Sequence, residues 1–152
     1  MKIKPTKAQV QDANNTKGLQ QFLQKLSLDQ YIKIFGTVFN RETHETTKFR
    51  LWKKQAKLAR LLTDSKFTLI PKARQLGISE IAAEEAIQTV LQYSRAVVLI
   101  FSKTDRDAME FLESKIKPKL ASLPNLKGIV YPKIVGESQK YIRLSNGSRI
   151  IS

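Results

Sequence analysis

The chain has 152 residues, 41% of them hydrophobic, which is enough to bury the core of one domain of ordinary size. It has no cysteine and a single histidine, His44, which excludes disulfide frameworks and thiolate zinc sites and argues against a histidine-based metal cluster. The formal net charge is +14, and it excludes neither nucleic acid nor anionic lipid as a partner.

The positive charge is concentrated in the first half of the chain. Residues 1–76 hold 16 basic against 5 acidic side chains, a net charge of +11, whereas residues 77–152 hold 11 against 8, a net charge of +3. Each lysine or arginine that neutralises a phosphate releases a condensed counterion, so nucleic acid is the first partner to expect. The alternatives are lysines that only keep the domain in solution, or contact with anionic lipid.

The N-terminal third predicts a polar arm followed by short helices. Residues 1–16 are polar and basic without sustained periodicity, which indicates a flexible arm. Apolar spacing in residues 17–39 predicts two short helices, the second ending at Gly36, and residues 40–48 read as a loop. No apolar run reaches 18 residues and the N-terminus is polar, so we expect a cytoplasmic protein with no membrane partner.

An amphipathic helix is predicted over residues 49–62. One face is apolar, and its members are Phe49, Trp52, Ala56, Ala59 and Leu62. The other side is mostly basic, with Lys53, Lys54, Lys57 and Arg60. Residues 67–70 then form a compact apolar run closed by Pro71, which favours a buried strand.

The second half alternates between helical and strand patterns. A helix is predicted over residues 78–93, and the unbroken apolar run at 95–101 favours a parallel strand covered on both faces. Ser102 is placed to cap the next helix, which Pro118 should kink or stop near Lys117. Asn146-Gly147 between β-prone runs predicts a hairpin.

This order of elements predicts the fold class and the organisation of the chain. Strands that alternate with helices favour an α/β three-layer sandwich like that of P-loop NTPases, with a mainly parallel sheet. N-terminal helices would precede it and a C-terminal β-hairpin would follow it, and the fold would be incomplete. The expected units are an arm at 1–16, a helical segment at 17–48 and the front portion of an ATPase domain at 49–152.

The segment between the predicted strand and helix has the properties of a phosphate-binding loop. Gly77 allows close approach of the backbone, the helix beginning at Ile78 directs its dipole toward phosphates, and the Ser79 hydroxyl stands where Mg²⁺ is held. Ile78 replaces the usual lysine, so Lys72 or Arg74 would supply the cation, and the sequence does not decide between them. The whole segment comprises Lys72, Ala73, Arg74, Gln75, Leu76, Gly77, Ile78 and Ser79.

This octapeptide closely resembles the variant phosphate loop of large terminase subunits, the ATPases that package viral DNA into capsids. The resemblance extends over about residues 46–152 and includes Gln55, which matches the adenine-contacting glutamine of that family. An amide that both donates and accepts suits the adenine edge. The resemblance implies that Lys72 and Arg74 act in catalysis, that residues 72–79 bind ATP, and that Ser79 ligates Mg²⁺.

The resemblance also implies partners and an incomplete catalytic site. Double-stranded DNA, a portal protein and a small terminase subunit would be the partners, in a bacterial host cytoplasm, and the complete protein would form a ring homo-oligomer. The paired acids that would position Mg²⁺ and the attacking water do not occur in this sequence. We therefore expect the N-terminal part of a terminase, which binds nucleotide but hydrolyses it poorly alone.

Two other interpretations of the sequence stay open. A fragment of a helicase-like nucleic-acid ATPase would share the upstream glutamine and the loop, although Ile78 stands at the lysine position that such loops normally keep. A small basic DNA-binding or adaptor protein without a nucleotide site would need only the basic first half and the lysines of the 49–62 helix.

Overall fold

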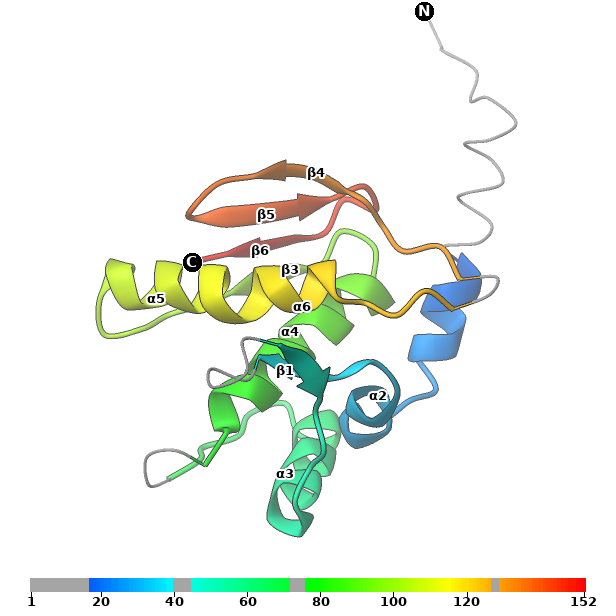
Figure 1. Cartoon of the computed structure of the whole chain (residues 1–152), viewed down its shortest axis with the longest axis vertical. Coiled ribbons are helices and arrows are strands. Elements are labelled where there is room, and N and C mark those ends of the chain that lie inside the picture. Colours follow the sequence, from blue (N-terminus) through cyan, green and yellow to red (C-terminus); the bar gives the residue numbers. More distant parts are fainter. Residues whose placement is uncertain (1–16, 40–44, 72–75, 127–128) are drawn as a thin grey trace, which may run out of the picture.

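The computed structural model of the chain describes residues 17–39, 45–71, 76–126 and 129–152 (Figure 1). Its strands form two separate sheets. The first pairs β1 (Thr37–Phe39) with β2 (Thr46–Lys48), antiparallel. The second has four strands in the order β3 (Val97–Leu99), β6 (Arg149–Ile151), β5 (Tyr141–Leu144) and β4 (Ile134–Glu137).

The prediction of a mainly parallel three-layer sandwich is wrong. In the larger sheet only β3 and β6 run parallel, whereas β5 pairs antiparallel with both of its neighbours. The segment 67–70, expected as a central strand, is not a strand, and the side chains of Phe67 and Leu69 are 95% and 94% exposed. An apolar run becomes a strand only when a neighbouring strand satisfies its backbone, and this segment pairs with no strand of the described ranges.

The described helices follow the predicted spacing more closely. Residues 17–23 are helical and α2 spans Leu28–Phe35, which confirms two short helices before Gly36. The helix after the loop is confirmed as α4. The remaining bounds are α3 Lys53–Asp64, α4 Ile78–Gln92, α5 Asp105–Phe111 and α6 Lys117–Ala121.

The interruption predicted at Pro118 takes the form of a π-helical turn. Residues Leu112–Ile116 join α5 to α6, and the Lys117 amide donates to the Leu112 carbonyl five residues earlier. Proline has no amide hydrogen and is tolerated in the first turn of a helix, which is where Pro118 lies in α6. The cap of α5 is Thr104 rather than Ser102, because the Thr104 hydroxyl accepts from the Asp107 amide at 3.1 Å.

The helices pack against one face of the larger sheet. Helix α4 contacts β3, β6 and the π-helical turn, and β4, β5 and β6 lie above it in Figure 1. The shared core contains Leu23, Tyr31, Ile32, Ile81, Ile87, Leu91, Leu112, Ile116, Ile142 and Ile150. The other face stays open, with Val97 and Leu99 of β3 48% and 55% exposed. The expectation that strand 95–101 is covered on both faces is therefore wrong.

The C-terminal hairpin is confirmed. β5 and β6 are antiparallel neighbours, and the turn between them contains Gly147 at φ 84°, a conformation that a residue with a Cβ rarely adopts. The Asn146 side chain donates to the Val90 carbonyl at 2.8 Å, which ties the turn to α4. The sequence pattern predicted only a loop at 40–48, whereas the structure has the threonine-rich strand β2 within this segment.

None of the helices in the described ranges is long and apolar enough to cross a membrane. The arm expected at 1–16 lies outside the described residues.

Candidate functional site

The candidate phosphate loop is described only at its C-terminal end. Lys72, Ala73, Arg74 and Gln75 lie outside the described residues, so their predicted contacts with phosphate stay predictions. The described half consists of Leu76, Gly77, Ile78 and Ser79.

Gly77 begins α4 with a left-handed backbone. Its φ is 68° and ψ 15°, and its carbonyl accepts from the amides of Glu80 and Ile81 at 3.1 and 3.3 Å. A Cβ on Gly77 would lie 2.7 Å from Nε2 of Gln55, closer than real Cβ atoms approach. Glycine is therefore favoured here by the backbone conformation, and an added Cβ would also have to displace the end of the Gln55 side chain. Because the helix begins directly after Gly77, the first backbone amides of α4 lie at the positive end of the helix, where they stabilise an anion.

Gln55 holds this entry from α3. Its side chain is 6% exposed, its Oε1 accepts from the Trp52 amide at 2.9 Å, and its Nε2 donates to the Leu76 carbonyl at 3.0 Å. The residue expected to read adenine thus lies against the loop in this structure. Gln55 and the loop come together across 21 residues of chain, whereas its contact with adenine stays a prediction.

Ser79 is exposed in the first turn of α4 and lines an open groove of about 880 Å³. The groove runs along the free edge of β3, between α4 and α5, and its other lining residues include Ile78, Ala82, Glu85, Val97, Leu99 and Asp107. Its volume is within the range of small-ligand sites. The Ser79 hydroxyl is therefore accessible, as a residue that ligates a nucleotide-bound Mg²⁺ must be.

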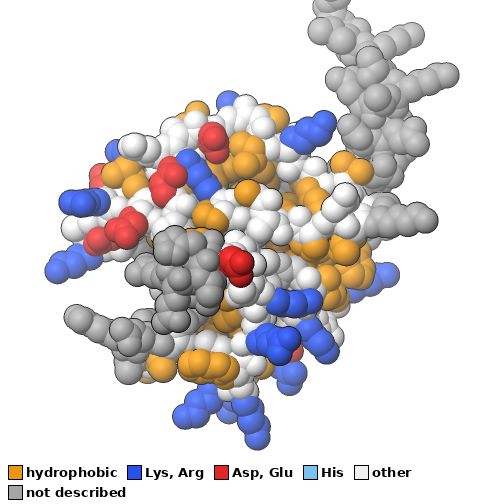
Figure 2. Space-filling model, in the orientation of Figure 1, with side chains coloured by type: hydrophobic (Ala, Val, Ile, Leu, Met, Phe, Trp, Pro, Cys, Tyr) orange, Lys and Arg blue, Asp and Glu red, His pale blue; other side chains and the backbone are white. Residues whose placement is uncertain are grey.

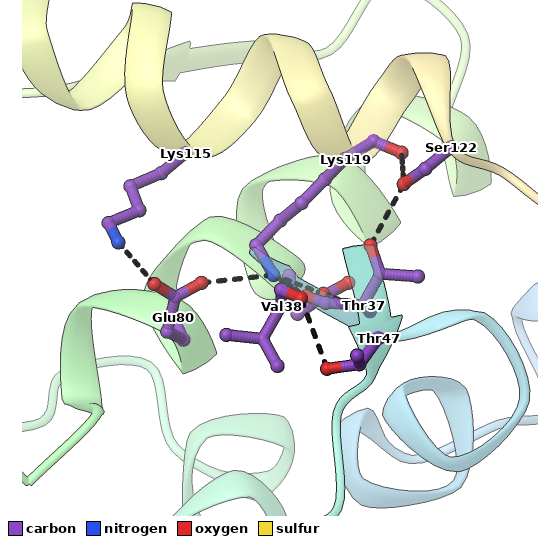
Figure 3. A network of polar contacts seen from close by, with 8 residues as sticks. Thr37, Val38, Thr47, Glu80, Lys115, Lys119 and Ser122 are labelled. Atoms are coloured by element: carbon purple, nitrogen blue, oxygen red, sulfur yellow. Dashed lines mark hydrogen bonds and ion pairs between the residues drawn. The ribbon is translucent and has the colours of Figure 1, made fainter. Parts of the chain in front are cut away.

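A network of charges fixes the turn that follows Ser79 (Figure 3). Lys119 of α6 is 6% exposed, and its ammonium lies 2.8 Å from Glu84 and 3.1 Å from Glu80, both of α4. It also donates to the Thr37 carbonyl of β1. Lys115 of the π-helical turn makes a further ion pair with Glu80. Four segments therefore meet around the beginning of α4.

The two carboxyl groups of this network have pKa values shifted in opposite directions. Burial alone would raise the pKa of Glu80, but the hydrogen bond from Lys115 and the charge of Lys119 outweigh it, and the pKa lies below its ordinary value. Glu84 is more deeply buried, and burial raises its pKa in spite of the ammonium of Lys119. Glu80 thus keeps its negative charge beside Ser79 at neutral pH.

The Glu80 pKa gives a test of the network. A carboxyl whose pKa is lowered on folding stabilises the protein above its ordinary pKa, about 4.3, and this contribution is lost as pH falls through the folded pKa. We expect Glu80→Gln to be less stable than wild type at pH 7, by an amount that shrinks as pH falls from about 5 to 3. Thermal unfolding of both proteins across this range measures the difference, to which the fall of the Glu84 pKa on loss of the neighbouring Glu80 charge also contributes. A difference independent of pH would contradict the assignment.

Helix α3 presents a basic surface next to the loop entry. Lys53, Lys54, Lys57 and Arg60 are exposed as predicted, and basic side chains gather around α3 in Figure 2. Trp52 was expected on the buried face, but it precedes the helix and is 65% exposed. Its backbone amide donates to Oε1 of Gln55.

Sequence reasoning missed the charge network. A signal was present, because Glu80 and Glu84 are four residues apart in one helix, as are Lys115 and Lys119 in the next one. When the two helices pack side by side, the two carboxylates of one helix can face the two ammonium groups of the other. Surface charge at the same spacing is far commoner, so the pattern alone does not identify a buried network.

Neither a comparison with models of known protein families nor a search of the curated proteins finds a match for this chain.

Proposed function

We propose that this chain binds ATP with Mg²⁺ at residues 72–79 and is the nucleotide-binding part of a large terminase subunit, a DNA-packaging ATPase. The observation that carries the proposal is the contact between buried Gln55 and the loop. Its amide hydrogen-bonds Leu76, and its Nε2 occupies the space beside the left-handed Gly77. An unliganded surface loop needs no such support, whereas phosphate binding requires backbone amides held in place in advance.

In this proposal each residue has a defined role. Lys72 and Arg74 neutralise the phosphates, Gly77 and the first amides of α4 surround them, and Ser79 holds the metal. Bound Mg²⁺ would supply neutralisation of the charge on the phosphate oxygens. Gln55 positions the loop, and its contact with adenine stays a prediction. The proposal rests on this local geometry and on the sequence resemblance, and it does not use the parallel sandwich that the structure contradicts.

Replacement of Lys72 tests the proposal. Loss of one charge-assisted contact of about 1.5–3 kcal/mol predicts that Lys72→Ala weakens ATP binding roughly 10- to 150-fold. Displacement of a fluorescent ATP analogue measures this, with Lys57→Ala of α3 as a control for loss of charge. Ser79→Ala should abolish the strengthening of binding by Mg²⁺. Equal affinity of wild type and Lys72→Ala would contradict the role of Lys72.

The adaptor interpretation is the second candidate, and the exposed α3 surface favours it. Lys53, Lys54 and Lys57 are free of ion pairs among the described residues, and Lys53 directly follows exposed Trp52 in the chain. A DNA-binding protein of this type would bind duplex DNA with steep salt dependence and show no saturable nucleotide binding. Measurement of both ligands on the same preparation separates the two candidates.

A further inference from the structure

We infer that the open face of the four-stranded sheet binds single-stranded nucleic acid, independently of the nucleotide site. The first observation is a pair of arginines, because Arg143 of β5 and Arg149 of β6 are directly opposite each other. Both are exposed. Like charges at such positions lie roughly 5 Å apart at Cβ and destabilise a sheet. Two arginines placed together against this cost indicate an anionic ligand on that face.

No acidic side chain on this face compensates the arginines within the described strands. The only acidic residue of β3, β4, β5 and β6 is Glu137, which pairs with Ile142. Ile142 is fully buried under the helices, so Glu137 belongs to the opposite face. Neither Arg143 nor Arg149 makes an ion pair in the described ranges. The face is therefore basic without internal neutralisation.

An aromatic ring lies beside the guanidinium. A Cβ built on Gly136 of β4 would lie 3.4 Å from Nη2 of Arg143 and 3.8 Å from Cε2 of Tyr141, so both groups border the same glycine. Tyr141 is 40% exposed. The next positions along this face are apolar, since Tyr141 is opposite Ile151, and Ile151 is opposite Leu99.

These features together match the chemistry of an unpaired strand. Arginines bind the phosphates, and an exposed aromatic on a sheet stacks with a base that is free of a partner. A duplex hides the faces of its bases, and the carboxylate side chains that make a peptide acidic carry no ring to stack on Tyr141. The occupant that fits both the arginine pair and the ring is thus single-stranded DNA or RNA.

The test is binding of fluorescently labelled oligonucleotides about 20 nucleotides long, followed by anisotropy over a range of salt concentration. Probes are oligothymidine, oligouridine and a DNA duplex of the same length. We expect Arg143→Gln with Arg149→Gln to weaken binding of a single strand at least tenfold. The slope of log affinity against log salt should fall in magnitude by about 1.4, as for two lost phosphate contacts. Tyr141→Leu should weaken binding about tenfold without changing the slope.

The matched control is Lys53→Gln with Lys54→Gln, which removes the same charge from α3. Removal of the arginine pair relieves repulsion, so the thermal midpoint of that variant should equal or exceed that of wild type. Tighter binding of oligouridine than of oligothymidine would assign RNA, and the reverse DNA. Three results would each overturn the inference. The first is an equal loss of affinity in the control variant, and the second is tighter binding of the duplex than of the single strands. The third is polyglutamate that binds as tightly as the oligonucleotides and with an affinity that Tyr141→Leu does not change.

Discussion

Lys119→Met is expected to destabilise the protein by about 3–5 kcal/mol, a large fraction of the stability of an ordinary domain. Methionine fills a similar volume but leaves the buried carboxylate of Glu84, 2% exposed, without the ammonium that lies 2.8 Å away. The Thr37 carbonyl loses its donor as well. Unfolding in urea at pH 7 measures the loss.

A control variant and a compensating substitution test whether the loss of stability comes from the buried network. The matched control is Lys117→Met, two residues earlier, which removes a partly exposed pair with Glu113 and should cost no more than about 0.5 kcal/mol. Glu84→Gln should restore part of the stability of Lys119→Met, because a neutral amide needs no counterion. Equal effects of the two lysine substitutions would contradict a buried network.

The second large effect is expected at Gly77. Alanine would hold a strained left-handed conformation and displace Gln55 from Leu76, a combined cost of about 2–4 kcal/mol. We expect Gly77→Ala to lose nucleotide affinity as well, since the loop entry moves. Denaturant unfolding and ATP titration of the same variant measure the two effects.

Gly147→Ala separates backbone strain from the contact with Gln55. Gly147 also has a positive φ, 84°, but its Cβ would meet Cγ of Arg95 at 3.1 Å, a flexible side chain far along the sequence from the loop. It should lose stability and keep nucleotide affinity. In the Gln55→Ala background the cost of Gly77→Ala should fall, because the obstructing amide is gone. If the double substitution costs as much stability as the two single substitutions together, Gly77 and Gln55 do not interact.

The sequence predicted local structure well wherever one pattern dominated. Helix α4 follows its apolar spacing, and Asn146-Gly147 specified the hairpin through a turn that glycine alone accommodates easily. Gln55 lies against the loop, and its predicted contact with adenine stays a prediction.

The sequence patterns did not predict how segments that are distant in the chain pack together. The apolar runs at 67–70 and 95–101 suggested two central strands, but hydrophobicity does not specify a neighbour, and Val97 lies on an open face. Trp52 fitted the apolar stripe of the predicted helix, but α3 begins one residue later and does not include it. The sequence pattern also does not predict the burial of Lys119, which contacts α4, Thr37 of β1 and the ring of Phe49 in the fold.

Nucleotide binding by this chain is tested most directly by an isothermal titration of the whole chain with ATP and Mg²⁺. If residues 72–79 bind ATP as proposed, one nucleotide binds each chain with saturation, roughly 10- to 150-fold more weakly in Lys72→Ala and with unchanged affinity in Lys57→Ala. An absence of saturable binding at millimolar ATP by correctly folded wild-type protein would contradict the proposal.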